Sequence, residues 1–195
     1  LAEERGPCPD AADYGVMERF SNKTAIAPTA SISIICGGTS PGVEPIAANS
    51  FTHKTLSGSF NVRNKYLRQL LEKHGKDTDE VWSSITTNQG SVSHLDFLTQ
   101  EEKDVFKTAF ELDQRWLVDL SADRTPHISQ AQSINIFLPA DVHKKDLHQI
   151  HFQAWKKGLK SLYYCRSKSI QRAENVNDAN STDIAATVYK SKKKQ

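Results

Sequence analysis

The stretch KTAIAPTASIS, residues 23–33, decides the fold class because it joins a strand pattern directly to a helix start. Its first half reads as a short buried strand that ends at Pro28. Thr29 and the small residues after it predict the opening of a helix, since threonine and serine are favoured N-cap residues. Gly37 and Gly38 then end that helix. A strand that leads straight into a helix is typical of α/β proteins.

The rest of the chain continues this alternation. Apolar spacing predicts further helices over 62–74, from 77 or 78 to about 85, from the capping box Thr99–Glu102 to just before Pro126, and from Asp141 to about 159. Strand patterns occur at 51–60 with a turn near Gly58, at 134–138 (INIFL) and at 160–165 (KSLYYC). Helices that alternate with short buried strands predict an α/β protein with parallel sheet pairing.

The composition changes beyond residue 171, where Glu, Asn, Asp, Ser and Lys dominate and the chain ends KSKKKQ. Such a segment cannot bury enough apolar surface to order itself. We therefore expect one domain over 1–170 and a disordered, lysine-rich tail over 171–195.

Charge and cysteine content argue against several classes of protein. The chain has 25 Lys and Arg against 23 Asp and Glu, a net charge of +2, which gives no reason to expect a nucleic-acid or membrane partner. The three cysteines, Cys8, Cys36 and Cys165, form no CxxC and predict a reducing, cytoplasmic compartment. The N-terminus has neither a signal-peptide pattern nor an initiating Met. We therefore expect that the chain begins inside a longer reading frame or has been processed.

The predicted helix start is a candidate anion site, formed by Thr29, Ala30, Ser31 and Ile32. Free backbone N–H groups and the positive end of the helix dipole bind phosphate, and small residues let the anion approach. From these residues alone, an ordinary capped helix is the commoner explanation, because most N-caps bind no ligand.

The adjacent tyrosines Tyr163 and Tyr164 are a second candidate, because a phenol can lose an electron and a proton together. Neighbouring strand residues point to opposite faces, so we expect one ring to face a pocket and the other the protein behind it. Two aromatics packing a sheet are the commoner explanation of such a pair. His143, His148 and His151 have no carboxylate or cysteine at ligand spacing, and no metal site is predicted.

Five segments in series carry a resemblance to a known family: NKTAIAPTASIS, CGGTSPGVEP, FTHKTLSGSF, ADRTPHISQAQSINIFL and HFQAWKKGLKSLYYCRS. Their order and spacing resemble the second half of the class I ribonucleotide reductase large subunit, over roughly residues 1–173. The resemblance implies the later half of a ten-stranded α/β barrel with a finger loop through its centre. It also implies radical-based reduction of ribonucleoside diphosphates to deoxyribonucleoside diphosphates.

The resemblance implies roles for particular residues. The substrate diphosphate would be held by Thr29, Ala30, Ser31 and Ile32, although the family's usual hydroxyl at the last position is replaced here by isoleucine. Tyr163 and Tyr164 would relay a radical from the metal-containing small subunit, with Tyr163 nearer the active-site cysteine. The helix at about 143–159 would lie where the family docks the small subunit's C-terminal tail. No cofactor is expected within this chain itself.

Other parts of the family's active site would lie upstream of Leu1: the thiyl-forming cysteine with its Asn and Glu partners, the first cysteine of the reducing pair, and the ATP and dNTP effector sites. No cysteine follows Cys165, so the route from a thioredoxin or glutaredoxin type reductant stays open. Two alternatives also stay open. One is a fragment of a cobalamin-dependent (class II) reductase, which needs no tyrosine relay, and the other is a non-catalytic remnant or assembly module.

Overall fold

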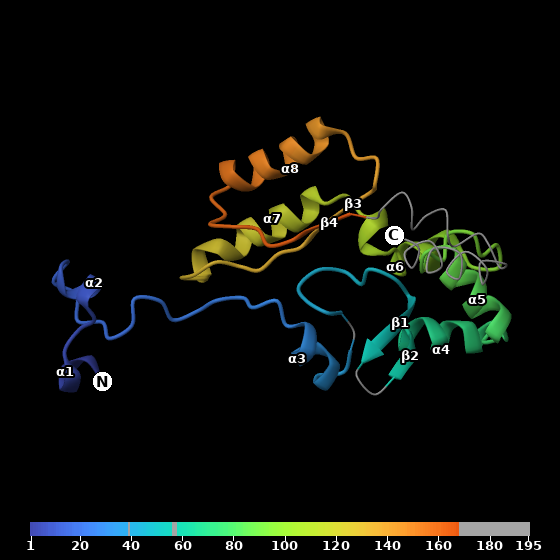
Figure 1. Cartoon of the computed structure of the whole chain (residues 1–195), viewed down its shortest axis with the longest axis horizontal. Coiled ribbons are helices and arrows are strands. Elements are labelled where there is room, and N and C mark those ends of the chain that lie inside the picture. The colour runs from blue at the N-terminus through green and yellow to red at the C-terminus, as the bar shows by residue number, and fades with distance from the viewer. Residues whose placement is uncertain (39, 56–57, 168–195) are drawn as a thin grey trace, which may run out of the picture. The chain divides into compact units, whose positions relative to one another are not determined.

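The computed structural model describes residues 1–38, 40–55 and 58–167, and these divide into two compact units (Figure 1). Unit 1 consists of Leu1–Pro45, Asp113–Ile136 and His143–Cys165. Unit 2 consists of Ile46–Leu112, Phe137–Val142 and the described residues after 165. The expected tail over 171–195, and the domain boundary at 170, lie outside the described residues.

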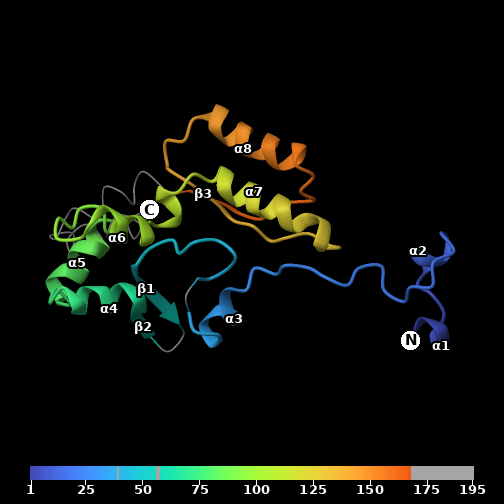
Figure 2. The ribbon, with the colours of Figure 1, turned by 180° about the vertical axis from the view of Figure 1, so that it is seen from behind.

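Unit 1 is mainly helical. Its helices are α1 (Ala2–Arg5), α2 (Pro9–Ala12), α3 (Ala30–Ile35), α7 (Arg115–Arg124), the 3-10 helix η2 (Thr125–His127) and α8 (Lys144–Lys156). Seen from both sides, α7 and α8 lie next to one another (Figures 1 and 2). Val118 of α7 and Ile150 and Ala154 of α8 are buried, which confirms the apolar face predicted for the last helix. That helix is capped by His143 rather than by Asp141, because the His143 ring accepts a hydrogen bond from the Lys145 amide.

The predicted strands at the two ends of the chain are shorter than expected. The segment 23–27 makes a single parallel bridge, between Ile26 and Gln132, and its side chains are mostly exposed. The strands β3 (Ile136–Leu138) and β4 (Cys165–Ser167) form a two-stranded sheet, and all three β3 residues are buried. The prediction of a buried strand at INIFL is thus confirmed, whereas the last strand begins at Cys165 instead of ending there.

Unit 2 combines a hairpin with short helices. Its elements are β1 (Ser50–Thr55), β2 (Gly58–Arg63), α4 (Lys65–Lys73), α5 (Asp79–Thr87), α6 (Gln100–Val105) and the 3-10 helix η1 (Ala109–Glu111). β1 and β2 are antiparallel, with Ser50 opposite Arg63. The core consists of Leu67, Leu71, Trp82, Ile85, Val92, Leu95 and Leu98. No helix among the described residues of the chain is long and apolar enough to cross a membrane.

The long helix predicted from Thr99 to before Pro126 is wrong, although its capping box is confirmed. Thr99 and Glu102 form that box, but α6 ends at Val105. The interruption comes at Thr108, whose backbone N–H and hydroxyl both donate to Glu111 Oε2 at 2.8 Å. This second, local hydrogen-bonded turn competes with the helix that the apolar spacing alone predicts.

Asn49 is the polar centre of unit 2 and is fully buried. Its amide nitrogen donates to the carbonyls of Gly90 and Phe106 at 3.0 and 2.7 Å, and its oxygen accepts from Asn64 at 2.8 Å. The Asn64 side chain in turn caps α4, which is why that helix begins at Lys65 rather than at 62. The backbone at position 90 lies so close to residues 48 and 49 that only glycine fits there, since a Cβ would lie 2.4 Å from the Ala48 Cβ.

Replacing Asn49 by alanine should destabilise unit 2 by about 3 kcal/mol, because it removes three side-chain hydrogen bonds from a fully buried position, to Gly90, Phe106 and Asn64. Urea unfolding followed by the fluorescence of Trp82, which is buried in the same unit, would measure this loss. The matched control is Asn88→Ala, which removes an exposed hydrogen bond to the Ser84 carbonyl and should cost less than about 0.5 kcal/mol. Equal unfolding midpoints for the two variants would contradict the central role of Asn49.

Candidate active site

The helix α3 begins where the sequence predicts, directly after Thr29. Thr29 has φ 58° and ψ 11°, a left-handed conformation that is uncommon for threonine. Its hydroxyl donates to the carbonyls of Pro28 and Pro41, at 2.9 and 3.4 Å, and makes no capping bond to the helix. The helical ladder starts with the Ser33 N–H, which donates to the Thr29 carbonyl at 2.8 Å. Thr29 is therefore an N-cap by position but not by its side chain.

Three backbone amides, those of Ala30, Ser31 and Ile32, precede this first helical bond. All three residues are exposed, with Ile32 at 56%. Because the Thr29 hydroxyl is used as a donor to carbonyls, it does not compete for these amides. The predicted substrate residues are thus brought together as a short row of N–H donors at the positive end of a helix.

The two tyrosines lie against one another. Their ring centroids are 4.1 Å apart with an interplanar angle of 53°, and Tyr163 and Tyr164 are 46% and 56% exposed. The expectation that the rings point to opposite faces is therefore wrong. The Tyr163 N–H donates to the Ile134 carbonyl at 2.8 Å, and the Ile136 N–H donates to the Tyr164 carbonyl at 2.9 Å. Two consecutive residues, Tyr163 and Tyr164, therefore bond to the same neighbouring segment. In a regular strand, consecutive residues bond on alternate sides, so the regular pattern is broken at this point.

One extended segment, residues 131–136, connects the two candidate sites within unit 1. Ile26 bonds to one edge of it: its N–H donates to the Ala131 carbonyl at 3.3 Å, and its carbonyl accepts from Ser133 at 2.9 Å. The tyrosines bond to Ile134 and Ile136, which have the other parity and so face the opposite edge. The helix start, three residues beyond Ile26, and the tyrosine pair therefore flank the same strand-like segment.

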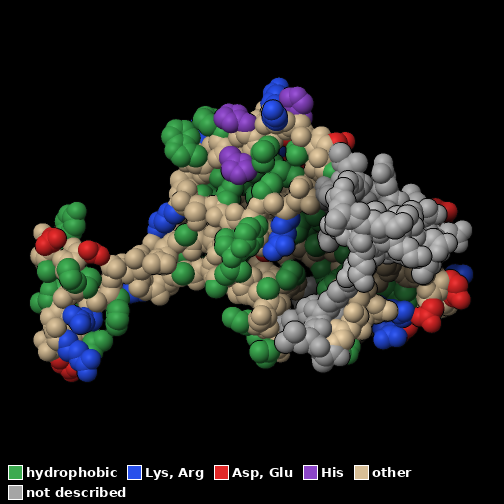
Figure 3. Space-filling model, in the orientation of Figure 1, with side chains coloured by type: hydrophobic (Ala, Val, Ile, Leu, Met, Phe, Trp, Pro, Cys, Tyr) green, Lys and Arg blue, Asp and Glu red, His purple; other side chains and the backbone are tan. Residues whose placement is uncertain are grey.

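The outer surface of α8 carries exposed aromatic side chains. Phe152 and Trp155 are 49% and 72% exposed, with ring centroids 5.6 Å apart, and the His148 ring stacks on Phe152 at 5.9 Å. Figure 3 shows histidine and hydrophobic side chains gathered over this helix. His143, His148 and His151 are all exposed. The described residues contain no group of three or more His, Cys, Asp or Glu that could hold a metal ion.

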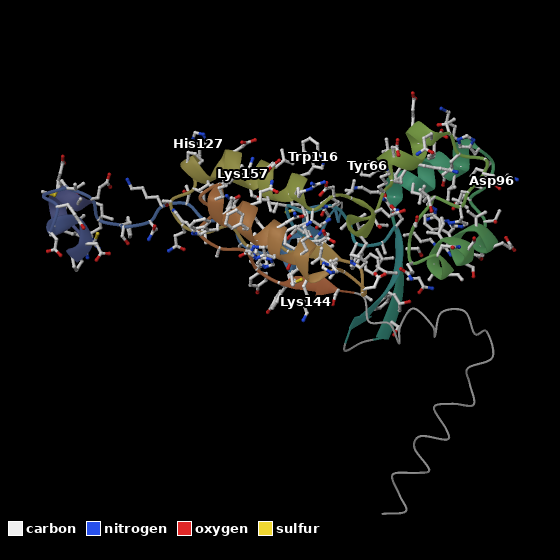
Figure 4. All side chains as sticks on the ribbon, turned by 90° about the horizontal axis from the view of Figure 1, so that it is seen from above. Tyr66, Asp96, Trp116, His127, Lys144 and Lys157 are labelled. Atoms are coloured by element: carbon white, nitrogen blue, oxygen red, sulfur yellow. The ribbon has the colours of Figure 1, made fainter. Side chains whose placement is uncertain are left out.

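An ion pair fixes α8 against α7. Lys157, labelled in Figure 4, lies at the end of α8, and its ammonium is 2.9 Å from Asp119 of α7, which also accepts a hydrogen bond from Gln153. The bond from Lys157 holds the pKa of the Asp119 carboxyl below its usual range, against a smaller opposing effect of desolvation. The aromatic surface of α8 is therefore presented by a helix that is held in place on its inner side.

Sequence reasoning missed Glu44, which is 4% exposed. Its carboxylate accepts a hydrogen bond from the backbone N–H of Asn135, in the segment between the two candidate sites. A glutamate followed by proline at the end of the SPGVEP turn gives no indication in one sequence that it is buried. The contact joins residues 91 positions apart, and neither periodicity nor a local motif can predict such a contact.

Comparisons with known proteins show the family of this chain. Residues 10–165 match the family model described as "Ribonucleotide reductase, barrel domain". The chain is 46% identical over 198 residues to the ribonucleoside-diphosphate reductase large subunit of Invertebrate iridescent virus 6, covering 96% of this chain and 20% of that protein. It is 36% identical over 175 residues to large chain 2 of the same enzyme from Saccharomyces cerevisiae, covering 86% of this chain and 20% of that protein.

A solved structure gives the same result. The class Id ribonucleotide reductase alpha subunit of Actinobacillus ureae superposes with a TM-score of 0.71 at 39% sequence identity, covering 89% of this chain and 31% of that one. The chain thus spans less than a third of the length of these relatives. The expected α/β barrel fold is confirmed for the part that the chain supplies. On the match of residues 10–165 to the family model, the chain belongs to the ribonucleotide reductase barrel-domain family.

Proposed function

We propose that this chain supplies the diphosphate-binding turn and the radical relay of a ribonucleoside-diphosphate reductase large subunit. The observation that carries the proposal is the shared segment 131–136, which Ile26 joins on one edge and the tyrosines on the other. A substrate held at the start of α3 and a radical arriving at Tyr163 would then be placed by one piece of backbone. The remaining active-site groups belong to the upstream part of the subunit.

The diphosphate of the substrate would bind at Thr29, Ala30, Ser31 and Ile32. The amides ahead of the first bond of α3 offer N–H donors, and the left-handed Thr29 turns the chain so that they share one helix end. Isoleucine at position 32 provides no hydroxyl, but its backbone N–H serves equally well as a donor. The substrate class is therefore a nucleoside diphosphate, recognised by its phosphates at this point.

The relay would pass through Tyr164 and then Tyr163. The 4.1 Å separation of the ring centroids suits a direct transfer, in which one phenol gives up its proton and electron as the other regains them. Tyr163 would then take the thiol hydrogen of the upstream cysteine, and that thiyl would take the ribose 3′-hydrogen while the 2′-hydroxyl leaves as water. A cobalamin-dependent reductase needs no such contact, so the ring pair favours the class I reading.

The partners follow from the same proposal. The small, metal-containing subunit would supply the radical and dock its C-terminal tail against α8, where Phe152 and Trp155 are exposed. A thioredoxin or glutaredoxin type protein would supply the electrons, in a cytoplasmic setting that suits the free thiols of Cys8, Cys36 and Cys165. ATP and dNTP effectors would act on the upstream part of the large subunit.

Complementation tests the proposal. This chain would be mixed with a separately produced upstream part of the large subunit and with the small subunit, and reduction of CDP would be measured. We expect deoxynucleotide formation only when all three are present, and none when cobalamin replaces the small subunit. A heat-denatured sample of this chain is the matched control. If the upstream part and the small subunit reduce CDP equally fast without this chain, the chain is a non-catalytic remnant.

A further inference from the structure

The segment 131–136 changes its hydrogen-bond partner along one edge. The change comes where residues 23–27 end and the chain turns into the start of α3. The Ser133 N–H donates to the Ile26 carbonyl at 2.9 Å. The next N–H on that edge is that of Asn135, and it donates to the Glu44 carboxylate instead of to a backbone carbonyl. The left-handed Thr29 turns the chain away there. A side-chain carboxylate thus takes the place that a continuing strand would have filled.

Glu44 is also packed against the turn itself. A Cβ on Gly42 would lie 2.1 Å from Glu44 Oε2 and 3.3 Å from the Pro28 carbonyl oxygen, so the carboxylate lies directly over Gly42, and Gly42 over Pro28. The Thr29 hydroxyl bonds back to Pro41, and the Ser40 hydroxyl donates to the Glu44 carbonyl. The loop 40–44 is therefore closed on one side against the helix start and on the other against Asn135.

We infer that Glu44 is a positioning residue, which fixes the diphosphate-binding turn relative to the segment that carries the tyrosines. Asn135 lies between Ile134 and Ile136, the two residues that bond to Tyr163 and Tyr164. Glu44 thus joins the diphosphate-binding turn to Asn135, which lies between the two residues whose backbones bond to the tyrosines. The inference rests on the proposed function, because it assigns Glu44 a task in holding the substrate.

The test uses the full-length large subunit with its small subunit, and measures kcat and KM for CDP separately. Glu44→Asp withdraws the carboxylate by one methylene, so KM should rise about tenfold, the size of one charge-assisted hydrogen bond, with little change in kcat. Glu44→Gln keeps an oxygen acceptor at the same length and should restore KM to within about threefold of the parent. A role in stability alone would lower the melting temperature without moving KM.

A second variant keeps the test decisive if Glu44→Asp does not fold. Gly42→Ala keeps the glutamate itself but its added methyl group forces the Glu44 carboxylate aside, so the variant should raise KM by a similar factor. The matched control is Ser129→Ala, because the Ser129 hydroxyl accepts from the amides of Lys23 and Thr24 at 2.9 Å and so makes a side-chain to backbone link in unit 1 away from the helix start. Unchanged KM in a folded Glu44→Asp or Gly42→Ala variant, or an equal rise in Ser129→Ala, would overturn the inference.

Failure of this inference differs from failure of the proposed function. Ser31 lies within the diphosphate-binding turn, so a Ser31→Asp variant reports on phosphate binding directly. If Ser31→Asp raises KM and Glu44→Asp does not, only the positioning role is wrong. If neither variant changes KM, the phosphate site itself is misassigned.

Discussion

Replacing Tyr163 by phenylalanine should abolish CDP reduction while CDP still binds. We expect kcat to fall by at least about 1,000-fold, equivalent to roughly 4 kcal/mol in activation free energy. Phenylalanine has no O–H from which a proton can leave with the electron, so the relay stops at this ring. The ring itself, and its contact with Tyr164 at 4.1 Å, would be retained, so the local packing should survive.

The measurement is steady-state kinetics of the reconstituted full-length enzyme together with equilibrium binding of CDP. Tyr66→Phe is a matched control, since Tyr66 is a half-exposed tyrosine in unit 2 that takes no part in the proposed relay. It should keep the parent kcat. If Tyr163→Phe retains more than about a tenth of the parent kcat, the transition state has lost less than roughly 1.4 kcal/mol and the relay assignment is wrong.

Replacing Ser31 by aspartate should separate substrate binding from helix stability. A carboxylate in the first turn of α3 interacts favourably with the helix dipole and should stabilise the helix by about 0.3–1 kcal/mol. The same charge lies among the amides proposed to hold the diphosphate, which it would both repel and replace. We expect KM for CDP to rise by about 30- to 100-fold, the loss of one or two charge-assisted hydrogen bonds.

The two effects have opposite signs, which makes the result hard to confuse with misfolding. The control is Ser31→Asn, because asparagine has nearly the same shape as aspartate but carries no charge. It should raise KM by less than about fivefold. The melting temperature of each full-length variant would be measured beside its KM. A Ser31→Asp enzyme of normal stability and unchanged KM would show that the diphosphate binds elsewhere.

Local signals in the sequence predicted the parts of the fold that depend on neighbouring residues. Thr99 and Glu102 form the predicted capping box, Thr78 caps α5, and the helix after Pro28 begins at the predicted residue. Each of these depends on a hydrogen bond or a backbone preference within a few residues. The long helix after Thr99 was mispredicted because an apolar repeat at helical spacing carries no information about a competing turn at Thr108.

For the candidate sites too, the sequence predicted what depends on nearby residues and missed what depends on distant ones. The proposal that the helix start and the tyrosines carry function rests on the order of several motifs, since each motif alone suits an ordinary cap or a packed sheet. The orientation of the rings depends on two backbone hydrogen bonds to a segment some 30 residues away, one donated by the Tyr163 N–H and one accepted by the Tyr164 carbonyl, and the alternation rule therefore failed. Glu44 was missed because its partner, Asn135, is distant in the chain and is a backbone group.

The alternating edges of residues 131–136 restrict how the chain can vary in length. Inserting one residue between Ser133 and Ile134 would turn every later backbone group to the wrong edge, so the tyrosines could no longer pair where they do. Inserting two residues would restore the facing but slide Tyr163 along the strand by roughly 6.6 Å. We therefore expect an insertion in this interval to disrupt the spacing between the proposed diphosphate site and the tyrosine rings.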